Sequence, residues 1–100
     1  DISIMKKTSV LINTSRGGVV NQSDLIKALK GGLISGAGLD VLEDEPVLDD
    51  NELLSIDNVI ITPHLAGFSE EALIKSREFA LSNARLVLDG LSASSVVLPI

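Results

Sequence analysis

Arg16 combines a chemically useful side chain with a position directly after an apolar run. It stands in the polar, glycine-rich turn Thr14–Gly18, which follows the β-branched segment Thr8–Asn13. A guanidinium forms two parallel hydrogen bonds with a carboxylate, so Arg16 could bind an acidic ligand. Gly17 and Gly18 would then let that ligand approach the backbone closely. The alternative interpretation is an exposed loop arginine, which is the commoner fate of a single Arg.

His64 is the only histidine of the sequence, and it follows Pro63 at the end of the apolar run Asn58–Thr62. An imidazole in that place could donate a proton near neutral pH, which is the usual catalytic use of histidine. Position alone favours equally a buried loop histidine that is bonded to a backbone carbonyl.

An acidic run could supply the partner that a catalytic histidine needs. Asp40, Glu43, Asp44 and Glu45 lie close together in the sequence, and Asp44 is interpreted as a solvated loop residue. Asp40 differs because it lies between two apolar residues, where an unpaired carboxylate would be costly to bury. A carboxylate beside His64 would stabilise the protonated imidazole, and spacing does not choose between Glu43 and Glu45.

The segments that carry these residues alternate between strands and helices. Strands are predicted at Thr8–Asn13, within Leu33–Leu42 and at Asn58–Thr62, helices after the capping residues Asn21 and Ser69, and a short helical turn at Asn51–Ser55. This order predicts an α/β fold: a partial, Rossmann-like, doubly wound parallel sheet of about three strands with flanking helices and a long C-terminal helix. Ligands of such sheets bind outside the carboxyl ends of the strands, where the polar turns are expected to meet.

The composition narrows the function classes. A net charge of −6 over 100 residues argues against nucleic acid as a partner. The absence of cysteine excludes disulfides and thiol nucleophiles, and one histidine cannot build a multi-histidine site, so no metal is expected. No apolar run approaches the roughly 20 residues of a membrane-spanning helix, so no membrane partner is expected and the cytoplasm is the default compartment.

Apolar residues make up 45% of the chain. Ser9–Ile12 and Val59–Ile61 are predicted to be strands buried on both faces, as parallel sheets require. Some of this apolar surface is expected to meet further chain or a partner subunit.

Three segments resemble signatures of the D-isomer-specific 2-hydroxyacid dehydrogenases, a family that includes phosphoglycerate dehydrogenase-like enzymes. They are Leu11–Val20 (LINTSRGGVV), Gly36–Leu42 (GAGLDVL) with Glu45-Pro46 after it, and Asn58–Gly67 (NVIITPHLAG). Their order and separation also agree with the family. The resemblance implies that residues 1–95 are the C-terminal part of an NAD-binding domain, and that 96–100 form a tail returning toward a substrate domain.

The resemblance also implies roles for individual residues. Arg16 would orient the substrate's carboxylate, His64 would be the acid and base, and Glu45 rather than Glu43 would assist His64. Asp40 would hold the nicotinamide carboxamide of NAD. The remaining positions that the resemblance places at the cofactor are Thr14, Ser15, Arg16, His64 and Gly67.

The function implied by the resemblance is hydride transfer between NAD(H) and a D-2-hydroxy acid or 2-keto acid, in a cytoplasmic homodimer. An NAD(H)-sensing, corepressor-like binding protein and an inactive fragment that dimerises are the alternatives. The family's Gly-x-Gly-x-x-Gly phosphate loop is not found in this sequence. We therefore expect the isolated 100-residue chain to be inactive.

Overall fold

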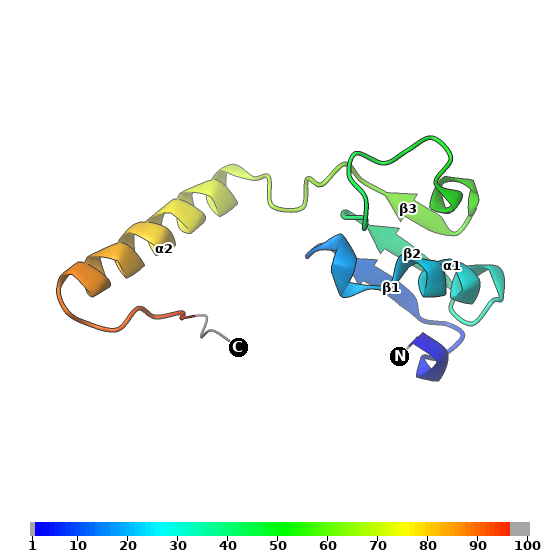
Figure 1. The fold of residues 1–100 in the computed structure, drawn as a ribbon, viewed down its shortest axis with the longest axis horizontal. Helices are drawn as coiled ribbons and strands as arrows, with labels where there is room; N and C mark the ends of the chain where they lie inside the picture. Colours follow the sequence, from blue (N-terminus) through cyan, green and yellow to red (C-terminus); the bar gives the residue numbers. More distant parts are fainter. Residues whose placement is uncertain (1, 97–100) are drawn as a thin grey trace. The chain divides into compact units, whose positions relative to one another are not determined.

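The computed structural model describes residues 2–96 (Figure 1). The chain divides into two compact units, Asp1–Ala66 and Gly67–Ile100. The assignment of residues 1–95 to one domain stays a prediction. The predicted tail 96–100 lies, apart from Val96, outside the described residues.

The first unit is built on a three-stranded parallel sheet with the order β1-β2-β3. Its elements are η1 (Ile2–Ile4), β1 (Val10–Asn13), η2 (Gly17–Val19), α1 (Gln22–Lys30), β2 (Gly36–Leu39), η3 (Glu52–Ser55) and β3 (Val59–Ile61), where η marks a short 3-10 helix. The predicted α/β architecture with a parallel sheet is therefore confirmed.

The register of the sheet brings the ends of the three strands to one level. Asn13 lies opposite Leu39, and Leu39 lies opposite Ile61. The ladder continues one residue further, because the amide of Asp40 donates to the carbonyl of Asn13 and the amide of Thr62 donates to that of Leu39. The turns that follow the three strands consequently begin at the same end of the sheet, where the carboxyl ends of the strands lie.

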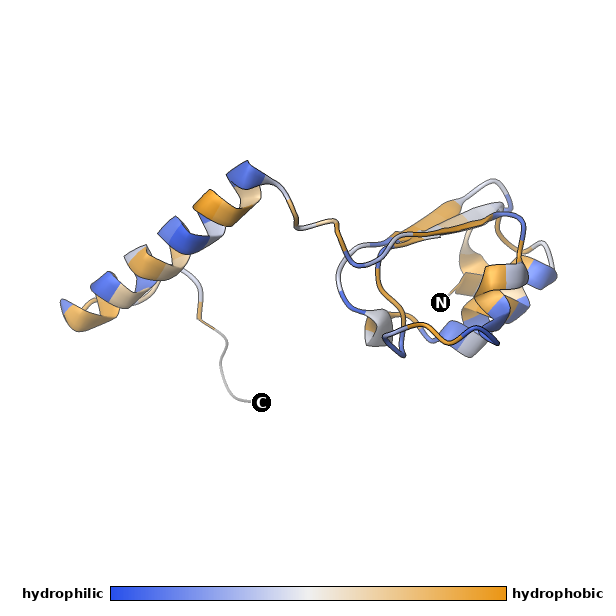
Figure 2. Ribbon diagram, turned by 90° about the horizontal axis from the view of Figure 1, so that it is seen from above, coloured by the Kyte–Doolittle hydropathy of each residue, from blue (hydrophilic) through white to orange (hydrophobic). Residues whose placement is uncertain are grey.

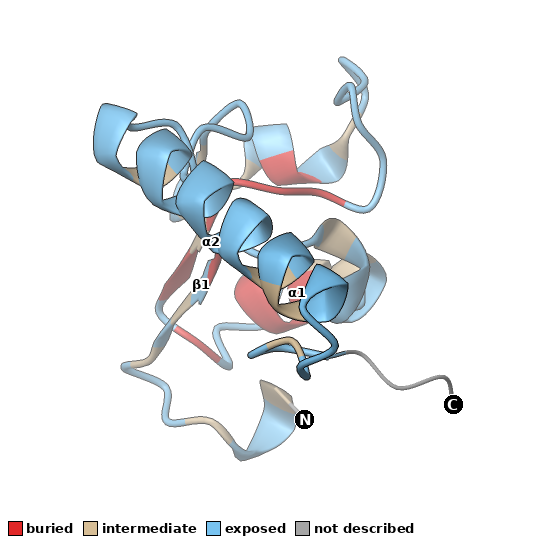
Figure 3. Ribbon diagram, turned by 90° about the vertical axis from the view of Figure 1, so that its left-hand side faces the viewer, coloured by how far each residue is buried: buried red, intermediate tan, exposed pale blue. Residues whose placement is uncertain are grey.

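Helix α1 begins where the sequence predicts it. The side chain of Asn21 accepts a hydrogen bond from the amide of Asp24, which satisfies one of the free N–H groups of the first turn. The helix buries an apolar stripe against the sheet, and η3 buries Leu53 beside it (Figure 3). The resulting core consists of Leu25, Leu29, Ile34, Ala37, Leu39, Leu42 and Leu53.

The glycines of β2 allow close packing, as the sequence predicts. A Cβ on Gly36 would lie 2.6 Å from the carbonyl oxygen of Asn58, and one on Gly38 would lie 2.8 Å from the end of the Ile12 side chain. β2 is the central strand, so these contacts place β1 and β3 close on either side of it.

Within the described residues the outer strands are covered on one face only, so the predicted burial of their second face stays a prediction. Val10 is 56% exposed, Ile12 66% and Ile60 72%. The register puts Ile12, Gly38 and Ile60 in one row on one face of the sheet. The core residues of α1 and η3 pack against the opposite face, so this row is uncovered by the described residues. We call Val10, Ile12, Gly38 and Ile60 the open face.

The second unit contains the predicted long helix, α2 (Glu70–Leu88). The Oγ of Ser69 accepts a hydrogen bond from the amide of Ala72 at its start, and Gly90 with φ 73° follows its end. Apolar and polar residues alternate along α2 (Figure 2), but none of its residues is buried, so the predicted apolar stripe finds no cover within residues 67–96.

None of the helices described in the chain is both long enough and apolar enough to cross a membrane.

Candidate functional site

The turn that carries Arg16 is shaped by the buried side chain of Asn13. Its Oδ1 accepts a hydrogen bond from the amide of Ser15 at 3.1 Å, and its Nδ2 donates to the carbonyl of Arg16 at 2.9 Å. An Asn side chain that bonds the backbone two residues later is a common way to close a turn. Asn13 is only 6% exposed, so this turn is anchored in the interior at the end of β1.

At Gly17 this turn packs closely against the acidic loop that follows β2. A Cβ on Gly17 would lie 1.8 Å from the carbonyl oxygen of Leu42 and 2.4 Å from the amide nitrogen of Glu43. The expectation that Gly17 opens the backbone to a ligand is therefore wrong, because the loop occupies that space. Gly18 has no atom within 4 Å of the same position and remains open.

The structure separates the two candidate glutamates. The Nδ1 of His64 lies 2.8 Å from the Oε2 of Glu45, while the Oε1 of Glu45 accepts a hydrogen bond from the amide of Leu42 at 2.9 Å. Glu43 instead accepts a hydrogen bond from the amide of Gln22 at the start of α1. The contact expected for Glu45 is therefore present, and Glu43 is a helix-end partner rather than a free surface group.

The His64–Glu45 pair is accessible from solvent. The side chain of His64 is 47% exposed and that of Glu45 is 39% exposed. Ion pairs of this exposure contribute little to stability, so the pair adds little to the stability of the fold. The hydrogen bond with His64, and after it that from Leu42, holds the pKa of the Glu45 carboxyl below its ordinary value.

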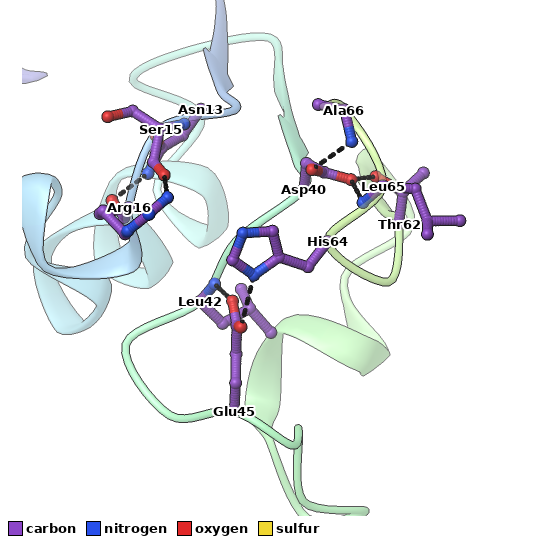
Figure 4. A network of polar contacts seen from close by, with 10 residues as sticks. All are labelled: Asn13, Ser15, Arg16, Asp40, Leu42, Glu45, Thr62, His64, Leu65 and Ala66. Carbon is purple, nitrogen blue, oxygen red and sulfur yellow. Dashed lines mark hydrogen bonds and ion pairs between the residues drawn. The ribbon is translucent and has the colours of Figure 1, made fainter. Parts of the chain in front are cut away.

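Arg16 lies on the turn beside this pair. In the view of Figure 4 the imidazole of His64 is drawn between the turn of Arg16 and the turn that follows β3. The positive charge of Arg16 is a smaller contribution to the lowered pKa of Glu45. Its guanidinium donates to the neighbouring carbonyl of Ser15 at 2.7 Å, and both residues are exposed. The fork thus remains on the surface, where a ligand could reach it.

Asp40 has the partners that its burial requires. Its Oδ1 accepts hydrogen bonds from the hydroxyl of Thr62 at 2.5 Å and the amide of Leu65 at 2.8 Å, and its Oδ2 accepts one from the amide of Ala66 at 2.8 Å. These bonds, with that from Thr62 the largest cause, hold the pKa of Asp40 below its ordinary value. One lone pair of Oδ2 therefore remains for the contact with a cofactor that is expected of Asp40.

A cavity of about 470 Å³ opens beside His64 and Glu45. Asp40 and Thr62 supply its other polar groups, and its apolar lining comes from Leu42, Pro46, Val47, Leu54, Ile61 and Pro63. A larger hollow of about 800 Å³ lies between η1 and α1, but it is lined by none of Arg16, Glu45 or His64. The smaller cavity is therefore the one that the predicted catalytic residues Glu45 and His64 line.

The remaining predicted cofactor residues are divided between the two units. Thr14 and Ser15 are exposed on the turn after β1. Gly67 is the first residue of the second unit, and its predicted cofactor contact stays a prediction. No group of three or more potential metal ligands occurs among residues 2–96.

Sequence reasoning missed the groups that hold the predicted catalytic and cofactor-binding side chains in place. Asn13 could have been found, because an Asn at a strand end is a signal for a turn of this kind. The hydroxyl of Thr62 and the amide of Leu42 carry no comparable signal. The Thr62 hydroxyl reaches Asp40 only after the strands have paired, whereas the Leu42 amide bonds Glu45 three residues later in the same loop.

Comparison with known proteins identifies the family. Residues 1–66 match the family described as D-isomer specific 2-hydroxyacid dehydrogenase, NAD binding domain. A glyoxylate reductase from Korarchaeum cryptofilum (strain OPF8) is 51% identical over 79 residues, which cover 79% of this chain and 24% of the relative. A D-3-phosphoglycerate dehydrogenase from Methanocaldococcus jannaschii is 43% identical over 96 residues, covering 96% of this chain and 18% of the relative.

A solved structure agrees with the fold. The crystal structure of a D-isomer specific 2-hydroxyacid dehydrogenase from Xanthobacter autotrophicus Py2, in complex with NADPH and MES, matches with a TM-score of 0.81 and 34% identity. The match covers 98% of this chain and 40% of that chain, and it confirms the Rossmann-like α/β fold. The chain spans about a quarter or less of the length of the two curated relatives described above. It therefore belongs to the D-isomer specific 2-hydroxyacid dehydrogenase family, and residues 1–66 are part of an NAD-binding domain.

Proposed function

We propose that this chain supplies the catalytic edge of a longer enzyme that transfers a hydride between NAD(H) and a D-2-hydroxy acid or 2-keto acid. The observation that carries the proposal is the 2.8 Å contact between His64 and Glu45 at the mouth of a cavity. This pair lies at the same carboxyl end of the sheet as the turn of Arg16, so a proton donor and a carboxylate-binding group face one region.

The residues divide the reaction between them. With Nδ1 paired to Glu45, the Nε2 of His64 is the ring nitrogen that would give its proton to the oxygen of a keto acid. Glu45 stabilises the protonated imidazole and fixes the ring, while Arg16 binds the carboxylate and sets which face of the carbonyl is presented. The nicotinamide, when bound, supplies the hydride.

The residues present suit the nicotinamide end of the cofactor. The cavity beside His64 has a mainly apolar lining, as a nicotinamide ring requires, and Asp40 retains a lone pair for a carboxamide N–H. Thr14, Ser15 and Gly67 are proposed to border the ring through their backbones. The pyrophosphate would need the Gly-x-Gly-x-x-Gly turn that this sequence does not contain.

A cytoplasmic location and a homodimer complete the proposal. The exposed apolar side chains of Val10, Ile12 and Ile60 support a further covered surface on the sheet, supplied by the remaining protein or by a second copy.

The direct test is an assay of the complete protein in which this chain occurs. We expect it to oxidise NADH or NADPH with at least one of glyoxylate, hydroxypyruvate, phosphohydroxypyruvate and pyruvate, and to yield the D-hydroxy acid. A protein that binds NADH tightly but reduces none of them would be the sensing protein instead.

Arg16→Lys in the complete protein tests the carboxylate-binding role. Lysine keeps the positive charge but loses the two-pronged geometry. A charge-assisted hydrogen bond contributes about 1.5–3 kcal/mol, so kcat/KM for the keto acid should fall roughly ten- to a hundredfold. The affinity for NADH, measured by calorimetry, should change little. Kinetics equal to wild type would return Arg16 to the interpretation as a surface loop residue.

Glu45→Gln tests the pairing with His64 through the pH dependence of the rate. The lowered pKa of Glu45 keeps its carboxylate ionised at neutral pH, and this charge favours the protonated imidazole. Reduction of a keto acid consumes that proton, so the rate is expected to fall as the pH rises. Removing the charge should move this fall to lower pH.

Glu43→Gln is the matched control, because a neutral amide can still accept the hydrogen bond from Gln22. Profiles of kcat/KM against pH for both variants decide the assignment. A shift in the Glu43 variant without one in the Glu45 variant would contradict it.

The isolated 100-residue chain is expected to bind NADH weakly, because it lacks the phosphate-binding glycine turn. Calorimetric titration of the chain with NADH should show no saturation at micromolar concentrations. A micromolar Kd would show that the nicotinamide end of the site is sufficient for binding.

A further inference from the structure

Asp40 is one of two buried polar residues in the part of the chain that the structure describes, and its carboxylate is directed at the turn that carries His64. It accepts one hydrogen bond from Thr62 on one side of His64 and two from Leu65 and Ala66 on the other (Figure 4). A single side chain at the end of the central strand therefore holds both flanks of the histidine.

The backbone of His64 needs such support. Its φ is +56°, in the left-handed region that residues with a side chain adopt infrequently. A residue persists there when its surroundings hold it in place. Its amide donates to the carbonyl of Thr62, and the next two amides both donate to Asp40. The left-handed turn is thus closed onto a buried carboxylate.

We propose that Asp40 is a positioning residue for the reaction: by holding residues 62–66, it keeps the His64 imidazole directed at Glu45 and the cavity. This inference rests on the proposed function and adds a role to the cofactor contact considered above. An ionised carboxylate is required, because all three partners are donors. An Asn side chain has one acceptor oxygen, and its NH₂ would face an N–H or O–H.

Asp40→Asn in the complete protein is the first test, with Asp57→Asn as the matched control at an exposed position of the same unit. Without cofactor, amide hydrogen exchange in the segment 64–67 should become about tenfold faster or more, since the amides of Leu65 and Ala66 lose their acceptor. The kcat for keto-acid reduction should fall roughly ten- to a hundredfold, because a misplaced acid is costly. The Asp57 variant should match wild type in both measurements.

Thr62 offers a second test that leaves the carboxylate in place. Thr62→Val keeps the shape of the side chain but loses the hydroxyl, whereas Thr62→Ser keeps the hydroxyl and loses the methyl group. We expect the Val variant to lower kcat by about tenfold, with KM for the keto acid and Kd for NADH within about twofold of wild type. The Ser variant should retain most of the wild-type kcat. This pair decides the matter if Asp40→Asn does not fold.

Three results would overturn the proposal. The first is unchanged exchange and kcat in Asp40→Asn. The second is a loss in Thr62→Ser as large as that in Thr62→Val, which would indicate packing rather than hydrogen bonding. The third is a change confined to NADH affinity, which would make Asp40 a cofactor ligand only. If the wild-type protein reduces no keto acid, the proposed function fails, while the exchange measurement still decides whether Asp40 holds the turn.

Discussion

His64→Gln in the complete protein is expected to lower kcat for keto-acid reduction by about 10²- to 10⁴-fold, the range that general acid catalysis contributes. Gln can still form a hydrogen bond with Glu45, but it cannot donate a proton at neutral pH. Steady-state kinetics and calorimetry with NADH measure the effect, and the affinity for NADH should stay within a fewfold of wild type because the side chain acts on the carbonyl oxygen.

His64→Asn is the companion variant for the backbone. Asn adopts a positive φ more readily than most residues, so it preserves the turn at φ +56° while removing the imidazole. Both variants should show the same loss. A kcat within tenfold of wild type for either one would mean that another group delivers the proton.

Gly17→Ala is expected to have the largest effect on stability. The added Cβ would lie 1.8 Å from the carbonyl oxygen of Leu42 and 2.0 Å from its carbon, and backbone atoms cannot rotate away as a side chain can. Overpacking usually costs about 1–3 kcal/mol, and a clash with backbone belongs at or above the upper end of that range. The midpoint of urea-induced unfolding should therefore fall sharply.

Gly18→Ala is the control, because its Cβ would meet nothing within 4 Å. Its stability should lie within about 0.5 kcal/mol of wild type, as for other surface substitutions. The Gly17 variant should also lose keto-acid reductase activity, since Gly17 connects the turn of Arg16 to the loop that leads to Glu45. Equal stability of the two variants would contradict the contact between these segments.

The elements were predictable from the sequence because their signals are local. Asn21 and Ser69 each bond an amide three residues away, so their role as helix caps can be recognised without the fold. The strands were also predicted in order, although the first and the third are shorter than expected. The structure places them at Val10–Asn13, Gly36–Leu39 and Val59–Ile61.

The site was predictable only in part, because its contacts are long in sequence. Spacing left Glu43 and Glu45 open, and the choice follows from how the loop meets α1: Glu43 bonds Gln22, 21 residues away, and Glu45 reaches His64, 19 residues away. The apolar neighbours of Asp40 indicate that its carboxylate needs a partner. They do not indicate which groups donate to it, because these donors lie 22 to 26 residues later in the sequence.

Two features could not be predicted from local composition. The residue type of Gly17 suggests ligand access, and the apolar composition of the outer strands does not say which face is covered within the chain. Both depend on which segment packs against them, which local composition does not record. Leu42 packs against Gly17, and the open face has no cover in the described part of the chain.

The open face also governs how the chain behaves at high concentration. Among the described residues β1 and β3 are the edge strands of the sheet, and they carry the exposed side chains of Val10, Ile12 and Ile60. Unpaired strand edges next to apolar side chains template pairing between molecules. The isolated chain should consequently self-associate as its concentration and the salt content rise, because salt screens the repulsion among its six net negative charges. Self-association, more than unfolding, would then limit the concentration at which the isolated chain stays in solution.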